Sequence, residues 1–250
     1  MARPKKSLAR VISRLGLGSR TQAAEWIRSG RVDVDGASTR DPDLRVDPEL
    51  TTILLDGRAV HAREPLYIAF HKPSGVLTSF GDPEGRKTIY DILPAFESWV
   101  APVGRLDRDT SGLLLLTNDT AFAARVTDPA AKIEKVYRVR TARPIDLAAL
   151  SALRAGVELS DGATLPARVE LIARYKSYAL LDLGIVEGRN RQVRRMLAAV
   201  GNRVAKLKLI DDTTAKRRPA AILIERARLA GSAGNPDEAL SLARQAHRLA

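Results

Sequence analysis

Residues 104–119, GRLDRDTSGLLLLTND, place charged side chains directly before a leucine run, which raises the question of a carboxylate with a chemical role. Asp107 and Asp109 are interspersed with Arg105 and Arg108, and a run of four leucines follows at residues 113–116. A leucine run bounded by polar residues is typical of a buried strand. A carboxylate at the end of such a strand can act as a nucleophile or a base, provided that a nearby cation compensates its charge. The alternative is a surface loop in which these charges form ordinary salt bridges.

The second segment that could carry chemistry is EGRNRQVRRM, residues 187–196. Val193, Met196, Leu197 and Val200 recur at helical spacing, which predicts an amphipathic helix with a basic opposite face. Residues 187–208 contain seven Lys or Arg and one Glu, and residues 1–31 contain eight Lys or Arg and one Glu. The positive charge is therefore concentrated in two regions, which argues against an evenly basic surface.

The composition of the whole chain narrows the class of partner. Its 250 residues include 41 Lys or Arg and 29 Asp or Glu, for a formal net charge of +12, which favours a nucleic acid as partner. The absence of cysteine excludes disulfides, thiolate zinc sites and a cysteine nucleophile, and the three histidines are scattered. No apolar run approaches the roughly 20 residues of a membrane span. We therefore expect a cytoplasmic protein without a metal site or membrane association.

The elements that must position these residues begin with a small basic region. Residues 8–15 have the apolar spacing of a helix, and Ser19 is a candidate N-cap for a second helix that ends at Gly30. The segments RVDVDG and TTILLDG predict two short strands, each closed by an Asp-Gly turn. Basic helices followed by a small sheet suggest an RNA-binding module, with a solvated helical hairpin as the alternative.

A larger α+β region follows a linker at residues 61–65, HAREP. Strands are predicted within YIAFHKPSG, GLLLLTND, KVYRVR and SYALLDLGIVEG, and helices within PIDLAALSALRAG and RNRQVRRMLAAVG. The last stretch is alanine-rich and predicts two helices joined at GNPDE. It is either one tetratricopeptide-like hairpin or an unrelated amphipathic hairpin packed on the core.

Residues 64 to about 208 resemble the bacterial ribosomal RNA pseudouridine synthases of the RsuA type. HKPSGVLTS is similar to the first motif of the family, and GRLDRDTSGLLLLTND matches its catalytic motif almost throughout. EKVYRV resembles the segment with the active-site tyrosine, and EGRNRQVRRM matches the third motif. Within residues 5–60, GLGSRTQAAEWIRSGRVDVDG resembles the alpha-L RNA-binding domain, first seen in a small-subunit ribosomal protein, that commonly precedes such synthases.

The resemblance implies an α+β fold with an alpha-L domain at residues 1–60 and a catalytic domain with a mixed, mainly antiparallel sheet at 64–212. The alanine-rich pattern adds a helical tail at 213–250. The resemblance implies isomerisation of a uridine to pseudouridine in ribosomal RNA. The large subunit is favoured because GRLDRDTSGLLLLTN is closer to those members. The reaction needs no cofactor or metal, and monomers are usual in the family.

The resemblance also implies roles for individual residues. Asp107 would be the catalytic carboxylate, Arg189 its ion-pair partner, and Tyr137 the residue that stacks on the base and moves a proton. The expected RNA contacts are Ser19, Arg20, Arg28, Arg31, Lys72, Arg105, Arg191, Gln192, Arg194 and Arg195.

The chain departs from the family after about Leu209, where DDTTAKRRPAAIL replaces the usual glycine- and leucine-bearing closing segment. This departure leaves a second hypothesis, a non-enzymatic RNA-binding protein with a synthase-like fold that acts in ribosome assembly. The presence of Asp107, Tyr137 and Arg189 favours the enzyme.

Overall fold

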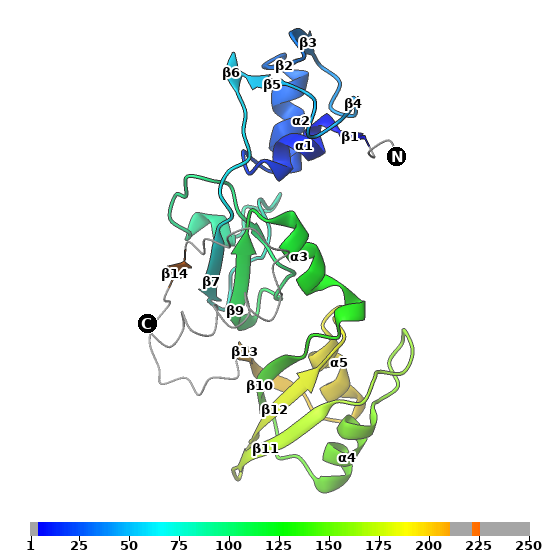
Figure 1. The fold of residues 1–250 in the computed structure, drawn as a ribbon. Helices are drawn as coiled ribbons and strands as arrows, with labels where there is room; N and C mark the ends of the chain where they lie inside the picture. Colours follow the sequence, from blue (N-terminus) through cyan, green and yellow to red (C-terminus); the bar gives the residue numbers. More distant parts are fainter. Residues whose placement is uncertain (1–4, 211–221, 226–250) are drawn as a thin grey trace.

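A computed structural model describes residues 5–210 and 222–225 (Figure 1). A small N-terminal part of helices and short strands lies at one end of the molecule and a larger sheet-based part at the other (Figure 1). None of the described helices is both long and apolar enough to cross a membrane.

The N-terminal part combines two helices with a four-stranded antiparallel sheet in the order β3-β2-β5-β6. The helices are α1 (Leu8–Arg14) and α2 (Arg20–Arg28). The sheet strands are β2 (Val32–Val34), β3 (Ala37–Thr39), β5 (Ile53–Leu55) and β6 (Arg58–Ala59), and a separate pair is formed by β1 (Lys6–Ser7) and β4 (Arg45–Val46).

Local sequence signals explain these elements. Ser19 is the N-cap of α2: its hydroxyl accepts from the Gln22 amide at 3.1 Å, and the Gln22 side chain accepts from the Ser19 amide at 2.9 Å. The Asp-Gly pairs at 35–36 and 56–57 adopt positive φ, as two-residue hairpin turns require. The predicted helices and Asp-Gly turns are therefore confirmed. Leu8, Ile12 and Ile27 are buried together beneath the sheet.

The larger part is organised around a sheet in the order β11-β12-β10-β13-β9-β7-β14, with β8 paired to β9. Only β13 and β9 run parallel among these pairs, which confirms the predicted mixed, mainly antiparallel sheet. The strands are β7 (Tyr67–Lys72), β8 (Ala101–Pro102), β9 (Thr110–Thr117), β10 (Lys135–Thr141), β11 (Arg168–Arg174), β12 (Ala179–Ile185), β13 (Val204–Ile210) and β14 (Ile222–Glu225).

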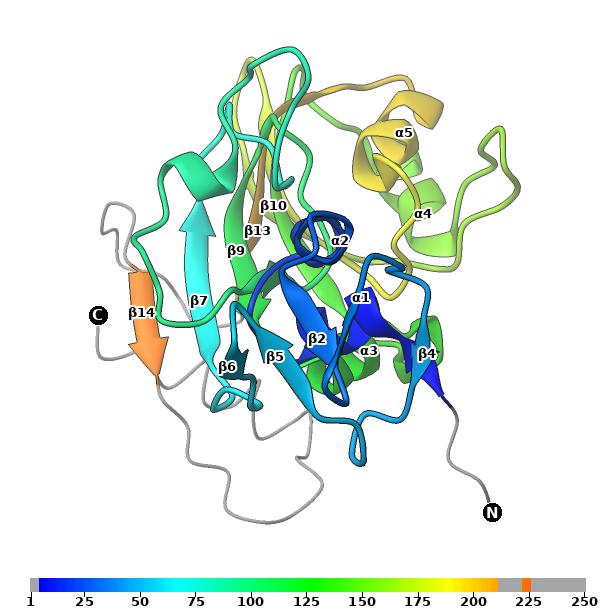
Figure 2. The ribbon, with the colours of Figure 1, turned by 90° about the horizontal axis from the view of Figure 1, so that it is seen from above.

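Helices complete two apolar cores along this sheet. The helices are α3 (Thr120–Thr127), α4 (Leu147–Ala155) and α5 (Gln192–Ala199), with 3-10 turns at Ile89–Asp91 and Pro129–Ala131. Figure 2 shows α4 and α5 close together on one side of the sheet, where Leu153 and Met196 are fully buried. A second core lies around β7 and β9 and includes Ile68 and Leu116. Tyr137 packs against both cores, which places it where they meet.

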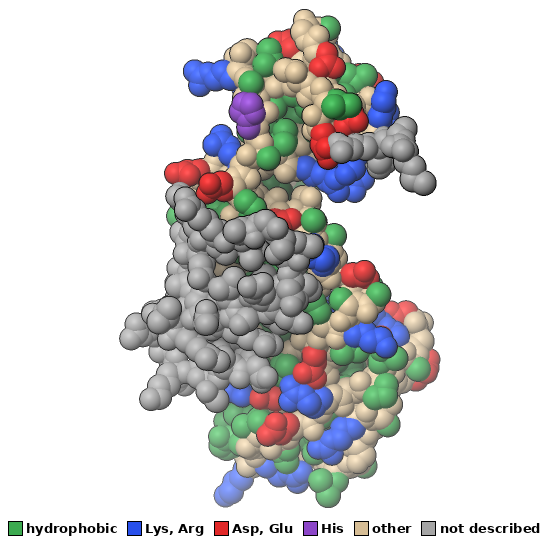
Figure 3. Space-filling model, viewed as in Figure 1, with side chains coloured by type: hydrophobic (Ala, Val, Ile, Leu, Met, Phe, Trp, Pro, Cys, Tyr) green, Lys and Arg blue, Asp and Glu red, His purple; other side chains and the backbone are tan. Residues whose placement is uncertain are grey.

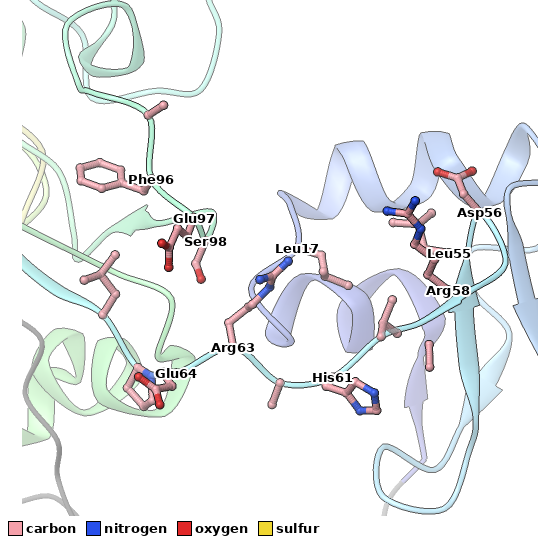
Figure 4. Close-up of a pocket in the computed structure, with 16 residues that line it drawn as sticks. Leu17, Leu55, Asp56, Arg58, His61, Arg63, Glu64, Phe96, Glu97 and Ser98 are labelled. Atoms are coloured by element: carbon pink, nitrogen blue, oxygen red, sulfur yellow. The ribbon is translucent and has the colours of Figure 1, made fainter.

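The two parts of the molecule touch where the loop after α1 reaches the larger part. The Trp99 amide donates to the Gly16 carbonyl at 3.0 Å, and the Arg63 amide donates to the Leu15 carbonyl at 3.2 Å. Beside this contact is an open pocket of about 1140 Å³, lined by both parts and the segment between them (Figure 4). Its lining includes none of the predicted catalytic residues, so it is separate from the predicted active site.

The structure of residues 222–225 contradicts one prediction from the sequence. Residues 222–225, expected in the first tail helix, form β14, which pairs antiparallel with β7 from Ile222 opposite Phe70 to Glu225 opposite Tyr67. The helical prediction is wrong for these four residues, because an isoleucine-rich segment meets an open strand edge there. The rest of the predicted tail, including the GNPDE junction and the tetratricopeptide-like hairpin, lies outside the described residues.

Candidate active site

Asp107 lies in the loop between β8 and β9, and residues of the first motif clamp this loop. The Thr78 hydroxyl donates to the Leu106 carbonyl at 2.9 Å, and the Leu106 amide lies 3.3 Å from the same hydroxyl oxygen. The Gly75 amide donates to the Arg108 carbonyl at 2.8 Å. The turn that follows β7 therefore holds the backbone on both sides of Asp107.

Lys72, at the end of β7, is fully buried and reinforces this clamp. Its Nζ donates to three backbone carbonyls, among them those of Thr110 at 2.9 Å and Arg108 at 3.3 Å. Burial lowers the pKa of Lys72 to about 8, although the negative charges of Asp107 and Asp109 act in the opposite direction. The prediction that Lys72 contacts RNA is wrong, because its ammonium group faces the inside of the loop.

The Asp107 side chain is 26% exposed and lies between two arginines. Its Oδ2 is 3.5 Å from Nη1 of Arg191 and 3.6 Å from Nε of Arg194. Both distances exceed a normal hydrogen bond, so the attraction is electrostatic. Arg194 is also anchored on the loop itself, because its Nη2 donates to the Asp109 carbonyl at 3.1 Å. Two guanidinium groups therefore compensate the charge of the half-buried carboxylate.

The backbone of Arg191 is strained. This residue is the N-cap of α5 and adopts φ 48° and ψ 35°, the left-handed region. That conformation costs a non-glycine residue about 1–2 kcal/mol. Such strain persists only where the surroundings impose it, and it concentrates at functional sites. Here the strained residue is one of the two whose guanidinium approaches Asp107.

Tyr137 reaches the site through the register of the sheet. In β10 it lies opposite Leu209 of β13, and Leu209 lies opposite Gly112 of β9. This close pairing requires glycine, because Gly112 has φ 122° and a Cβ there would collide with the Leu209 carbonyl. Burial raises the pKa of Tyr137 to about 12, and the negative charge of Asp107 adds to the rise. The phenol is therefore protonated near neutral pH and lies within the electrostatic reach of Asp107.

Arg189 makes different contacts from those predicted. Its Nε donates to the Glu187 carboxylate at 2.9 Å, and its Nη atoms donate to the carbonyls of Gly162 at 2.8 Å and Ala163 at 2.6 Å. The predicted ion pair between Arg189 and Asp107 is wrong. The loop before β11 supplies carbonyls that take up this guanidinium, whereas the arginines two and five positions later face Asp107.

Four of the predicted RNA-contacting residues are buried or ion-paired in the structure. Gln192 is buried, and its side chain donates to Glu187 at 2.8 Å; Ser19 is buried and caps α2. Burial of both side chains argues against direct phosphate contacts by Ser19 and Gln192. Arg31 pairs with Asp56 at 2.6 Å, and Arg195 pairs with Asp161. The predicted contacts that the structure leaves exposed are Arg20, Arg28, Arg31, Arg105 and Arg191.

Two residues of the site were not singled out from sequence. Thr78 lies inside the first motif, but nothing in its neighbours indicates that its hydroxyl holds the Asp107 loop. Gly112 carried a usable signal, since a glycine inside a predicted buried strand often marks a close approach of another backbone.

The assembled site presents a carboxylate flanked by two cations and next to a protonated phenol. Such a carboxylate can act as a nucleophile or a base, and the phenol can donate a hydrogen bond or stack on a planar group. Across residues 5–210 and 222–225, no group of three or more His, Asp or Glu side chains is arranged to hold a metal ion.

Comparisons with known proteins agree with this arrangement. Residues 66–199 match the family model described as RNA pseudouridylate synthase, and residues 7–51 match the S4 domain, the alpha-L domain that was predicted. Ribosomal large subunit pseudouridine synthase B of Bacillus subtilis (strain 168) is 40% identical over 205 residues, which cover 80% of this chain and 83% of that protein. An uncharacterized RNA pseudouridine synthase of Aquifex aeolicus (strain VF5) is 37% identical over 202 residues, covering 80% and 81%.

A solved structure is also similar. The crystal structure of a pseudouridylate synthase is 31% identical, covers 81% of this chain and 86% of its own, and gives a TM-score of 0.56. The segment matched to the synthase model contains Asp107, Tyr137 and Arg194 together with most of the sheet that positions them. The chain therefore belongs to the RNA pseudouridine synthase family.

Proposed function

We propose that this enzyme converts a uridine of large-subunit ribosomal RNA into pseudouridine, with Asp107 as its catalytic carboxylate. The choice of substrate is supported by the names of relatives such as the Bacillus subtilis protein. The observation that carries the role of Asp107 is its position: a half-buried carboxylate on a clamped loop, 3.5 Å and 3.6 Å from two guanidinium groups.

The reaction is an isomerisation that needs no electron donor or acceptor. The bond between ribose C1′ and N1 of uracil breaks, the base turns, and C5 bonds to C1′. The proton on C5 is then lost and N1 gains one, so atoms and charge balance. Asp107 acts either as a nucleophile at C1′ or as a base toward a ribose proton, and both roles require the ionised carboxylate.

The target base must reach Asp107, and other residues of the site stabilise the RNA when it does. A uridine inside folded RNA leaves its stack at a cost of about a few kcal/mol. Tyr137 offers an aromatic surface for the extruded base beside Asp107. Phosphate contacts by exposed arginines offset part of the cost, with Arg20 and Arg28 on α2 and Arg105 and Arg191 near the loop.

The proposed function also implies roles for the two domains, an oligomeric state and a cellular location. We assign RNA affinity to residues 1–60 and catalysis to residues 64–212. We expect a monomer, because Asp107, Tyr137, Arg191 and Arg194 come from one chain and build the site without a second copy. A cytoplasmic location follows from the proposed ribosomal RNA substrate.

The test compares wild type with Asp107→Asn on large-subunit ribosomal RNA transcribed in vitro. Asparagine keeps the shape of the side chain but removes the ionisable group, so no pseudouridine should form while RNA affinity and thermal stability change little. Pseudouridine is measured by carbodiimide labelling and primer extension, which also identifies the target position.

The matched control is Asp109→Asn, which removes an exposed carboxylate two residues away and should leave activity intact. Substantial isomerisation by a folded Asp107→Asn protein, with deamidation excluded by mass spectrometry, would contradict the role of Asp107. A wild-type protein that binds this RNA without modifying it would instead support the non-enzymatic hypothesis.

A further inference from the structure

The turn between β11 and β12 carries two tyrosines that stack on each other. The ring centroids of Tyr175 and Tyr178 are 4.4 Å apart, with an interplanar angle of 24°. The turn is closed by the Tyr175 amide, which donates to the Tyr178 carbonyl at 2.8 Å. The Arg140 guanidinium carbon, from the neighbouring strand β10, lies 4.3 Å from the centroid of the Tyr178 ring.

These contacts build a stack with one open end. Arg140 and Tyr175 both lie within 4.4 Å of the centre of the Tyr178 ring, and two planar groups cannot share one face at that distance. They therefore occupy opposite faces, and the order of the stack is Arg140, Tyr178, Tyr175. Tyr175 is 46% exposed at the end of this stack, so an aromatic surface remains open beyond it. A rigid, half-exposed ring of this kind is a surface on which a nucleobase can stack.

Two cations, Arg174 and Lys176, flank Tyr175 in the sequence, and further cations lie along the strands on the Arg140 side of the stack. Strand pairing brings together three segments, residues 139–144, 173–180 and 201–207, because Arg140 lies opposite both Leu180 and Lys206, and Thr141 lies opposite Val204. None of the three segments contains Asp or Glu; the carboxylates that follow along the strands are Asp182, which is paired with Arg138, and Glu170 opposite it, and Asp146 caps α4. The cations that they contribute are Arg140, Arg143, Arg174, Lys176, Arg203 and Lys206.

The position of this turn suits a contact with a long substrate. Figure 1 shows the β11–β12 turn at the end of the molecule that is farthest from the N-terminal domain, with the strands of the active site between them. Lys and Arg side chains are visible at the surface of this same end in Figure 3. The turn and the N-terminal domain are therefore two well-separated places on the molecule.

We propose that the β11–β12 turn is a second RNA-binding site, in which an unpaired base stacks on Tyr175 while Arg174 and Lys176 contact its phosphates. This inference extends the proposed function, because it concerns how RNA is held and not how uridine is isomerised. Stacking does not depend on base identity, since every base has a π face, so the site contributes affinity with little sequence preference. A purely structural role would account for Arg140 and Tyr178, which stack on each other across neighbouring strands, but does not explain the exposed ring of Tyr175.

The first experiment measures binding alone, by fluorescence anisotropy of the full chain with a labelled oligouridylate of about ten nucleotides. Tyr175→Ala should raise the Kd about tenfold, whereas Tyr175→Phe should bind like wild type because the ring is retained. Lys176→Gln should reduce the slope of log Kd against log salt by about 0.7, the value for one phosphate of a single strand. The matched control is Leu147→Ala, which removes a 72% exposed apolar side chain on α4 and should change neither quantity.

A second measurement locates the contact directly. The same oligonucleotide with 5-iodouridine is crosslinked by light to the wild-type protein, and the linked peptide is identified by mass spectrometry; the adduct is expected on Tyr175. Tyr175→Leu serves as the folding control, since leucine still covers Tyr178 but offers no π face. If Tyr175→Leu keeps the wild-type thermal midpoint and binds within twofold of wild type, the stacking site does not exist. Adducts confined to the N-terminal domain or to Tyr137 would also overturn the proposal, and neither result depends on whether pseudouridine forms.

Discussion

The ammonium group of Lys72 donates to the carbonyl of Thr110 at 2.9 Å, which ties the end of β7 to the start of β9 directly behind the Asp107 loop. The same nitrogen also reaches the Arg108 carbonyl, so it holds two backbone oxygens on the C-terminal side of Asp107. A buried ammonium is costly unless its donors are used. The cost is offset here because the ammonium group donates to three backbone carbonyls, two of them in this loop.

Replacing this lysine should misplace the carboxylate without touching it. In Lys72→Met the Thr110 carbonyl loses the ammonium donor, while the Arg108 carbonyl keeps the Gly75 amide; the loss costs about 1–3 kcal/mol for an unsatisfied group. A shift of about 1 Å in Asp107 would lower kcat about 100-fold. The measurement is single-turnover pseudouridine formation with saturating enzyme, which separates the chemical step from binding. Lys87→Met, at an exposed lysine, is the control, and equal rates for the two variants would contradict the positioning role.

The same lysine predicts a pH dependence of stability. Its pKa is lowered to about 8 in the folded protein from 10.5, so between these values the unfolded chain binds more protons. The contribution of Lys72 to the free energy of unfolding should therefore rise with pH from about 8 to 10.5 and be constant below that window. Urea titrations of wild type and Lys72→Met across this range measure the free energy of unfolding of each protein. As the pH rises, the free energy of wild type should increase relative to that of Lys72→Met. A decrease relative to Lys72→Met would contradict the prediction.

Three of the four arginines in the third motif should have different roles. Arg191→Ala and Arg194→Ala remove a cation beside Asp107 and should each lower kcat about 10- to 100-fold through misorientation of the carboxylate. Arg189→Ala should instead lower the thermal midpoint, because Glu187 and the carbonyls of residues 162–163 lose their partner. Arg194→Lys separates charge from geometry, since a lysine keeps the cation but not the planar group. An Arg189→Ala variant with normal stability and no activity would restore the role that the motif suggested for it.

Gly112 should tolerate no side chain. In Gly112→Ala the new Cβ collides with the Leu209 backbone, and the backbone also has a φ that alanine rarely adopts. We expect a loss of about 3 kcal/mol or more in the free energy of unfolding, combining overpacking with an incompatible backbone conformation. Denaturant titration measures it. Gly81→Ala is the control, because a Cβ at that position would meet no atom within 4 Å, and the substitution should be neutral.

We expect strand β14, residues 222–225, to contribute to the thermal stability of the sheet. A protein that stops after residue 212 lacks the backbone pairing of β14 with β7, so the edge of β7 is exposed. We expect the thermal midpoint to fall by about 4 °C or more, since each kcal/mol is worth about 2–4 °C at this size. A protein that stops after residue 225 keeps β14 and should behave like the full chain. If both truncated proteins melt together, β14 contributes nothing to the sheet.

The sequence by itself determined the S4 domain, the mixed sheet and the loop that carries Asp107. The S4 domain and the mixed sheet follow from the resemblance of several motifs, in order, to a known family. The helices, turns and buried strands follow from local signals: the Ser19 cap, the Asp-Gly turns and the leucine run. Each depends on residues close together in the chain, whose backbone preferences and side-chain periodicity act before any distant contact forms.

Only the tertiary structure decided which partner each charged residue takes. Arg189, Arg191 and Arg194 lie within six positions, yet the left-handed backbone at Arg191 and the start of α5 send the first to Glu187 and the other two to Asp107. Lys72 is a lysine in a basic protein, and only the pairing of β7 with β9 shows that it is buried. The strand at 222–225 depends in the same way on the free edge of β7, a property of the assembled sheet. Ion pairing and burial depend on which segments meet across long separations, and that information does not reside in the spacing of neighbouring residues.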